Sequence, residues 1–110
     1  MSFVKYPFGA ADSQSLAFAA AIAATINNTK TVATIAQLTG AATLNLSINT
    51  EMPVGAELIV KVSADATGRT LTLGTGLTGN AQVLAISKSY SMKFEYDGTT
   101  FVHMSTNLLN

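Results

Sequence analysis

Hydrophobic and polar residues alternate with a period of two through the C-terminal part of this chain. Between Ser89 and Tyr96, aromatic residues and methionine fill every second position, and serine, lysine and glutamate fill most of the others. Such alternation gives an extended strand one apolar and one polar face. Asp97-Gly98 follows, and a second apolar run begins at Phe101. Asp-Gly between two such runs is a strong hairpin signal, because glycine takes a positive φ without steric cost. We therefore predict a β-hairpin over residues 89–105.

The same alternation recurs upstream in shorter segments that are separated by glycine, proline, asparagine and aspartate. It predicts strands over residues 30–38, 42–48, 57–64, 69–73 and 81–87, a turn over 65–68, and loops over 49–55 and 74–80. Short strands with turn signals every 8–12 residues or so are typical of a β-sandwich or barrel. We predict an all-β domain of about eight strands over residues 16–110.

Residues Leu16 to Ile26 fit two patterns. Every second residue forms a bulkier face, as in a strand, but Phe18, Ile22 and Ile26 also recur at helical spacing and alanine favours a helix. We predict a strand, because Asn27-Asn28 is typical of a tight turn that leads into another strand.

The N-terminal segment, residues 1–15, is predicted to be a short irregular arm. It carries Phe3, Tyr6 and Phe8 close to Pro7 and Gly9, and proline and glycine disfavour regular structure. The three aromatic side chains either pack on their own domain or dock on a neighbouring subunit.

The Asp97-Gly98 turn allows two registers, which bury different side chains. A two-residue loop places Phe101 on the same face as Phe94, with Val102 and Met104 on the polar face. A three-residue loop instead places Val102 and Met104 beside Met92, and leaves Phe101 and His103 on the polar face. Either register leaves large apolar groups on that face, which is the signature of an interaction surface. Phe101, Val102, His103 and Met104 are therefore candidate interface residues.

Composition supports self-association and excludes several classes of function. Only 11% of the 110 residues are charged, whereas about 25% is usual, and 48% are hydrophobic. A surface with few ions costs less to desolvate against a partner. Six basic and six acidic residues cancel and the basic ones are scattered, so we expect no nucleic-acid binding. We expect no membrane span, because the apolar run at 16–26 is too short.

We expect no catalytic or cofactor site and predict that the protein is not an enzyme. The chain has no cysteine, and its one histidine, His103, cannot form a zinc site without partners at ligand spacing. Asp97 is committed to the turn, so a carboxylate pair with Glu95 is a weak candidate for acid–base chemistry. The glycine-rich segment at 74–79 lacks the Lys-Ser/Thr and the helix of a phosphate loop. Asp65 and Arg69 are expected to form an ion pair that stabilises a turn.

Several stretches together resemble a known module. These are Leu38-Thr39-Gly40 with the strand that follows, Val54-Gly55-Ala56-Glu57-Leu58, Asp65-Ala66-Thr67-Gly68-Arg69-Thr70-Leu71-Thr72-Leu73-Gly74, and Phe94-Glu95-Tyr96-Asp97-Gly98-Thr99-Thr100-Phe101-Val102. Over about residues 30–105 the chain is similar to the small all-β module of bacteriophage virion proteins, which occurs in fibre tips, head fibres and capsid decoration proteins. The motifs are strand and turn signals, so they specify a fold better than a role.

The resemblance implies a jelly-roll-like antiparallel β-sandwich, a homotrimer, and a structural role without enzymatic activity. Only the short arm precedes the module, whereas fibre proteins carry a long shaft, and this favours a decoration protein on the capsid exterior. Its expected partners are its own copies and the major capsid protein or other virion proteins, after synthesis in the host cytoplasm. The alternative is a fibre-tip or head-fibre module that recognises a host-surface glycan through the loops at 49–55 and 74–80.

Overall fold

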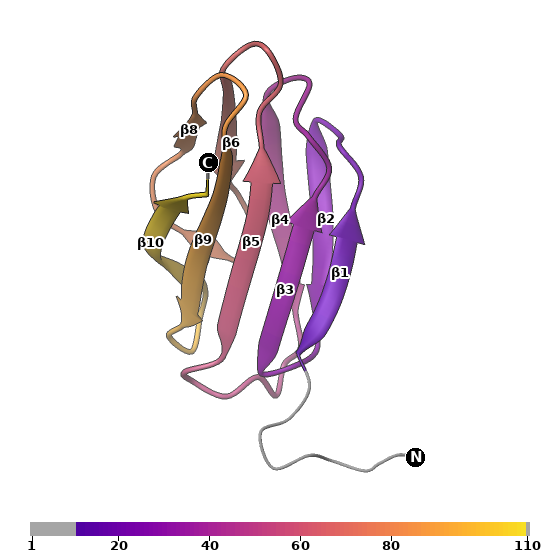
Figure 1. The fold of residues 1–110 in the computed structure, drawn as a ribbon. Coiled ribbons are helices and arrows are strands. Elements are labelled where there is room, and N and C mark those ends of the chain that lie inside the picture. The colour runs from indigo at the N-terminus through magenta and orange to yellow at the C-terminus, as the bar shows by residue number, and fades with distance from the viewer. Residues whose placement is uncertain (1–10, 110) are drawn as a thin grey trace.

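The computed structural model describes residues 11–109, which form two β-sheets packed face to face (Figure 1) and contain no helix. The strands are β1 (Asp12–Leu16), β2 (Ala21–Ile26), β3 (Lys30–Ile35), β4 (Ala42–Ile48), β5 (Glu57–Ser63), β6 (Arg69–Leu73), β7 (Leu77–Thr78), β8 (Gln82–Leu84), β9 (Ser89–Tyr96) and β10 (Phe101–Leu108). The predicted all-β class is confirmed, with ten strands in this part of the chain rather than eight.

Successive strands from β1 to β9 belong alternately to the two sheets. The six-stranded sheet has the order β1-β3-β5-β9-β10-β7, and the four-stranded sheet has the order β2-β4-β6-β8. Every connection from β1 to β9 therefore crosses from one layer to the other. Within residues 11–109, the β9–β10 hairpin is the one place where consecutive strands pair with each other.

The prediction of antiparallel strands is wrong for most of the sandwich, and the jelly-roll-like order is not confirmed. Five strand pairs are parallel, namely β1–β3, β3–β5, β2–β4, β4–β6 and β7–β10. The β5–β9, β9–β10 and β6–β8 pairs are antiparallel. Alternation shows which face of a strand is covered. It does not show whether the neighbouring strand is parallel or antiparallel, because side chains alternate with a period of two in both kinds of sheet. The turns carry the chain between layers instead of reversing it within one sheet.

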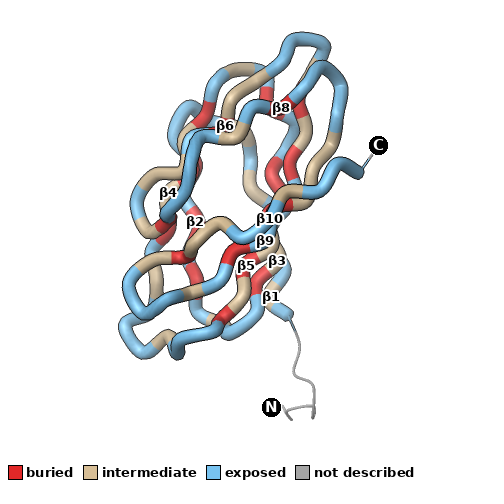
Figure 2. Tube along the Cα trace, turned by 90° about the vertical axis from the view of Figure 1, so that its left-hand side faces the viewer, coloured by how far each residue is buried: buried red, intermediate tan, exposed pale blue. Residues whose placement is uncertain are grey.

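The hydrophobic core lies between the two sheets, where Figure 2 shows the buried positions on the inner sides. The strands β2, β3, β4 and β5 bury every second residue, and their predicted inner faces are correct. The fully buried large side chains are Ile26, Leu38, Leu44, Leu58, Val60, Leu71, Leu84, Met92, Phe94 and Phe101. Burying one large apolar side chain contributes about 1.5–3 kcal/mol, so these residues carry most of the drive to fold.

The strands predicted over 42–48, 57–64 and 69–73 agree with the structure to within one residue, whereas the one predicted over 30–38 ends at Ile35 and the one over 81–87 is only Gln82–Leu84. Residues 16–26 are strand rather than helix, but they are divided between the end of β1 and β2 by a connection at 17–20. The arm expected over residues 1–15 is wrong for Asp12–Ser15, which form most of β1. This strand escaped notice because its inward side chains include Asp12 and Gln14 and give no apolar period. Short β7 lies inside the expected 74–80 loop.

Thr31 offers a direct test of the core. It is fully buried on the inner face of β3, and its hydroxyl has no hydrogen-bond partner. A buried hydroxyl without a partner costs about 1–3 kcal/mol. We expect Thr31→Val, which keeps the shape and removes the hydroxyl, to raise the free energy of unfolding by about 1 kcal/mol. Urea denaturation measures this, with Thr34→Val at an exposed position of the same strand as the control. A loss of stability in Thr31→Val would contradict the assignment.

Candidate interaction surface

An apolar groove lies on the outer face of the six-stranded sheet, beside the β9–β10 hairpin. It has a volume of about 440 Å³ and is lined by Val54, Gly55, Glu95, Tyr96, Asp97, Val102 and Met104. Val54 is 73% exposed and Met104 is 56% exposed, and both lie beside Val102 in this groove. An apolar patch rimmed by polar groups marks an interaction site. We call this surface the hairpin groove.

Backbone hydrogen bonds fix both walls of the hairpin groove. The Gly55 N–H donates to the Tyr96 carbonyl at 2.9 Å, and the Tyr96 N–H donates to the Ala56 carbonyl at 2.9 Å. Gly55 has a φ of 96°, a conformation that glycine adopts without strain. These contacts hold the β4–β5 loop against the hairpin, so that Val54 stands beside the strand ends.

The turn at the end of the hairpin groove is capped by Asp97. Its Oδ1 accepts hydrogen bonds from the backbone N–H groups of Thr100 (2.9 Å) and Thr99 (2.8 Å). The Asp97 N–H donates to the Thr100 carbonyl at 3.1 Å, and Gly98 has a φ of 103°. The N–H groups of Thr100 and Thr99 lower the pKa of Asp97, because they stabilise its ionised form.

Neither predicted hairpin register is correct. The structure pairs Tyr96 with Phe101 and Glu95 with Val102, which leaves residues 97–100 as a four-residue loop. The two-residue alternative still predicts the correct faces, because its pairing differs from the observed one by two residues, and a shift of two keeps each side chain on its own face. A bulge between His103 and Ser105 then shifts the register.

The structure divides the candidate interface residues into two groups. Val102 and Met104 line the hairpin groove, and their role at an interface stays a prediction. Phe101 is fully buried in the core, with its ring centroid 5.0 Å from that of Tyr96, so its assignment to an interface is wrong within this chain. Phe3, Tyr6 and Phe8 lie outside the described residues, and their role stays a prediction.

His103 also faces inward, where it belongs to a polar chain between the two sheets. Its Nε2 lies 2.6 Å from Thr106 Oγ1, and the Thr106 hydroxyl donates to Gln82 Oε1 at 2.9 Å. Since Thr106 has one proton to give, His103 must donate to it through Nε2–H. Gln82 Nε2 in turn donates to the Asn80 carbonyl at 2.8 Å. These hydrogen bonds link β10 to β8 across the edge of the sandwich and give His103 a structural role.

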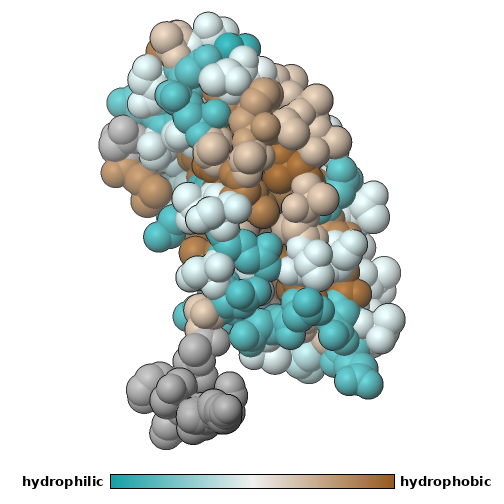
Figure 3. Space-filling view, turned by 90° about the vertical axis from the view of Figure 1, so that its right-hand side faces the viewer, coloured by the Kyte–Doolittle hydropathy of each residue, from teal (hydrophilic) through white to brown (hydrophobic). Residues whose placement is uncertain are grey.

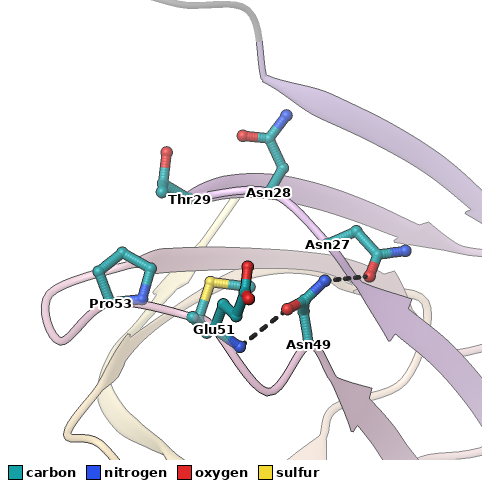
Figure 4. Close-up of a pocket in the computed structure, with 7 residues that line it drawn as sticks. Asn27, Asn28, Thr29, Asn49, Glu51 and Pro53 are labelled. Atoms are coloured by element: carbon teal, nitrogen blue, oxygen red, sulfur yellow. Dashed lines mark hydrogen bonds between the residues drawn. The ribbon is translucent and has the colours of Figure 1, made fainter.

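The two loops suggested as glycan sites behave differently. The 49–55 loop contributes to a polar pocket of about 210 Å³ that is lined by Asn27, Asn28, Thr29, Asn49, Glu51, Met52 and Pro53 (Figure 4). In this pocket Asn49 Nδ2 donates to Asn27 Oδ1 at 3.3 Å, and Asn49 Oδ1 accepts from the Glu51 N–H at 2.8 Å. The pocket lining includes no aromatic ring on which a sugar could stack.

The 74–80 loop instead closes one edge of the sandwich. The Thr75 carbonyl accepts from the Leu46 N–H at 2.8 Å, and the Gly76 carbonyl accepts from the Phe101 N–H at 2.9 Å. One short segment therefore joins the four-stranded sheet to the six-stranded sheet. Any Cβ at Gly76 would lie 2.9 Å from Leu46 Cβ, so glycine is needed for this close approach. The loop therefore holds the two sheets together at this edge.

The predicted Asp65–Arg69 pair is confirmed at the turn between β5 and β6. Arg69 Nε and Nη2 donate to the two oxygens of Asp65, each at 2.9 Å, and the Thr67 N–H donates to Asp65 Oδ1 at 3.0 Å. Hydrogen bonding from Arg69, followed by that from Thr67, lowers the pKa of Asp65. The pair therefore stabilises the turn between β5 and β6.

These two aspartates predict how acid affects the fold. A carboxyl whose pKa is lower in the folded chain than in the unfolded chain adds stability above the unfolded value, near 3.8, and that stability disappears as pH falls through the folded value. We expect the melting temperature to fall below about pH 4. The Asp65→Asn/Asp97→Asn double variant should have a lower melting temperature than the natural protein at neutral pH. Its melting temperature should also fall less as the solution is acidified. Parallel curves for both proteins would contradict this assignment.

Within residues 11–109 no group of three or more histidine, aspartate or glutamate side chains could hold a metal ion, and no helix is long and apolar enough to cross a membrane. No protein-family model matches the chain, and no curated protein matches it in sequence. A functional assignment therefore depends on the hairpin groove and on the sequence motifs.

Proposed function

We propose that this protein is a structural component of a bacteriophage particle that decorates the capsid exterior as a homo-oligomer, most simply a trimer. The observation that carries the proposal is the hairpin groove, where Val54 and Met104 are more than half exposed beside Val102. The resemblance of residues 30–105 to virion modules supports the particle and the trimer, and the hairpin groove supports the self-association.

The electrostatics of the hairpin groove favour a second copy of this chain as its occupant. Glu95 and Asp97 line the groove, but on the same sheet Lys93 Nζ lies 3.4 Å from Glu57 Oε2, so acidic and basic groups are interspersed there. With six residues of each sign the chain repels its own copies little. Covering apolar side chains on such a surface gains hydrophobic free energy at a small cost in desolvated charge.

Native mass spectrometry together with sedimentation tests the proposal. We expect a discrete oligomer at micromolar concentration and co-sedimentation with particles of the phage that encodes the chain. A monomer at all concentrations, without binding to particles, would overturn it. A deletion meant to probe the N-terminal arm should stop at residue 10, because removal of residues 1–15 would also remove most of β1.

A second candidate is a fibre-tip or head-fibre module that binds a host-surface glycan. The polar pocket of Figure 4 supports it, because amide and carboxylate groups from two loops surround a small cavity and could hydrogen-bond sugar hydroxyls. Selective binding on a glycan array, with loss of that binding in Glu51→Ala, would favour this function. Equal, weak signals for all sugars would count against it.

A further inference from the structure

Among residues 11–109 the N-terminal edge of the sandwich, formed by β1 and β2, has no pairing partner in either sheet. Among residues 11–109 nothing pairs with the outer edge of β1 in the six-stranded sheet or with the outer edge of β2 in the four-stranded sheet. Figure 3 views the molecule from this side and shows apolar residues gathered over the upper part, with polar residues below. The question is what covers these edges.

The hydrogen bonds between β2 and β4 show which backbone groups of β2 point away from β4. The carbonyls of Ala20 and Ile26 accept from β4 and from the residue after it, so even-numbered residues of β2 point their backbone groups towards β4. In a parallel ladder the odd-numbered residues then point their N–H and C=O groups outward. These are Ala21, Ala23 and Thr25, and the side chains of all three are exposed.

The edge lacks the usual protection against added strands. Exposed edges in natural proteins carry lysine, proline or bulges that prevent pairing, whereas the outward residues of β2 are two alanines and a threonine. One free carbonyl is already used, because Gln14 Nε2 donates to the Thr25 carbonyl at 2.6 Å and also to Asp12 Oδ2 at 3.0 Å. The part of β2 whose outward backbone groups remain available for pairing therefore precedes Thr25 and includes Ala21 and Ala23.

We propose that residues 1–7 of the same chain add a strand to β2, parallel to it, as the outermost member of the four-stranded sheet. Strands alternate between the sheets from β1 to β9, so a strand before β1 belongs in the sheet of β2. A parallel neighbour of β2 would run towards the end at which β1 begins (Figure 1). The direction and the layer therefore both fit the segment that enters β1.

The length of the segment also fits. The connection between β1 and β2 takes four residues, 17–20. A connection of the same length before Asp12 would use Phe8-Gly9-Ala10-Ala11 and leave residues 1–7 for a strand. That strand would end at Pro7, which has no N–H to donate and is tolerated because the added strand would be an edge strand. A covalently attached segment also has a high effective concentration at this edge, which favours it over a second copy.

The proposal gives the N-terminal aromatics a place on their own domain. Phe3 and Tyr6 are three residues apart, so they would lie on opposite faces of the added strand. One of the two rings would then extend the apolar surface at this edge of the sandwich. This is packing on their own domain, the first of the two roles expected from the sequence, in place of docking on a neighbouring subunit. The proposal does not depend on the hairpin groove, which lies on the hairpin and not at this edge.

Amide hydrogen exchange of the full chain tests the proposal, with an internal control. We expect the N–H groups of Ala21 and Ala23 to exchange at least about tenfold more slowly than those of Ser13 and Ser15, once intrinsic rates are corrected. The two serines present the outward groups of β1, which the proposed strand does not reach. The difference should persist on dilution. Equal, fast exchange at both edges would overturn the proposal, as would protection of both edges that fades on dilution, which would assign the edge to a second copy.

Proline substitutions identify the pairing segment. Adjacent residues of a strand point their backbone groups in opposite directions, so of Phe3→Pro and Val4→Pro one must remove a donor to β2. That variant should lose the protection at Ala23, whereas Val4→Thr, a β-branched control, should keep it. Circular dichroism confirms that each variant is folded. Full protection at Ala23 in both proline variants would overturn the proposal.

Disulfide trapping separates pairing within one chain from exchange between chains. Neighbouring strands lie about 4.8 Å apart, within reach of a disulfide, and the natural chain has no cysteine. Of Phe3→Cys/Ala23→Cys and Val4→Cys/Ala23→Cys, at least one pair should oxidise to a monomer on a non-reducing gel. Covalent dimers, or no disulfide in either pair, would overturn the proposal.

Discussion

Replacing Phe101 with alanine is expected to remove about 3–5 kcal/mol of folding free energy. The ring is completely buried between the sheets, and Tyr96 and Phe101 occupy opposite positions of the hairpin. The backbone of Phe101 also receives the 74–80 loop through Gly76. A cavity at this point would therefore loosen the hairpin and the loop that joins the two sheets. Since a domain of this size has about 5–15 kcal/mol of stability in total, much of the variant should be unfolded at physiological temperature.

Thermal and urea denaturation of Phe101→Ala measure this loss. We expect the melting temperature to fall by more than about 10 °C, because 1 kcal/mol shifts it by roughly 4–8 °C in a domain of this size. Leu108→Ala is the matched control, since it truncates a large apolar side chain on the same strand at an exposed position outside the hairpin groove. A Phe101→Ala variant with normal stability and an altered oligomeric state would restore Phe101 to the interface predicted from the sequence.

Phe101 illustrates how far the sequence could predict this fold. The alternation of apolar and polar residues predicted most of the strands and their inner faces, because the covered side of a strand is usually apolar whatever lies next to it. It could not predict the partner of each strand. β1, β3 and β5 form parallel pairs that are distant in the sequence, and neither their turns nor their side-chain pattern differs from those of hairpins.

The site was predictable in part for the same reason. Of the two registers predicted for the hairpin, the one with a two-residue loop places Val102 and Met104 on the otherwise polar face, where the structure has them. Their role at an interface stays a prediction. Val54 was not found, because it comes from a loop that reaches the hairpin through a backbone contact of Gly55 with Tyr96. The inward position of His103 depends on its pairing with Phe94, which in turn depends on the loop length. Neither contact leaves a signal in the local sequence.

Introducing a carboxylate into the hairpin groove by Met104→Asp should dissociate the proposed oligomer while the monomer keeps its fold. Met104 is 56% exposed in the monomer, so an aspartate there stays hydrated and costs little stability. In an oligomer that covers the hairpin groove, the same carboxylate would be buried beside Glu95 and Asp97 without a cation. A buried charge without a partner costs about 3–5 kcal/mol. This cost corresponds to an association at least about a hundredfold weaker.

Asn107→Asp is the matched control, because it adds one carboxylate to an exposed position of the same strand outside the hairpin groove. Analytical ultracentrifugation should show monomers for Met104→Asp and the normal oligomer for Asn107→Asp and for Met104→Leu. Circular dichroism and the melting curve separate dissociation from unfolding. If Met104→Asp stays oligomeric at the wild-type concentration, the copies associate through another surface, and the hairpin groove loses its role. If both aspartate variants dissociate equally, net charge rather than the hairpin groove controls assembly, because a local apolar contact cannot respond to a charge placed outside it.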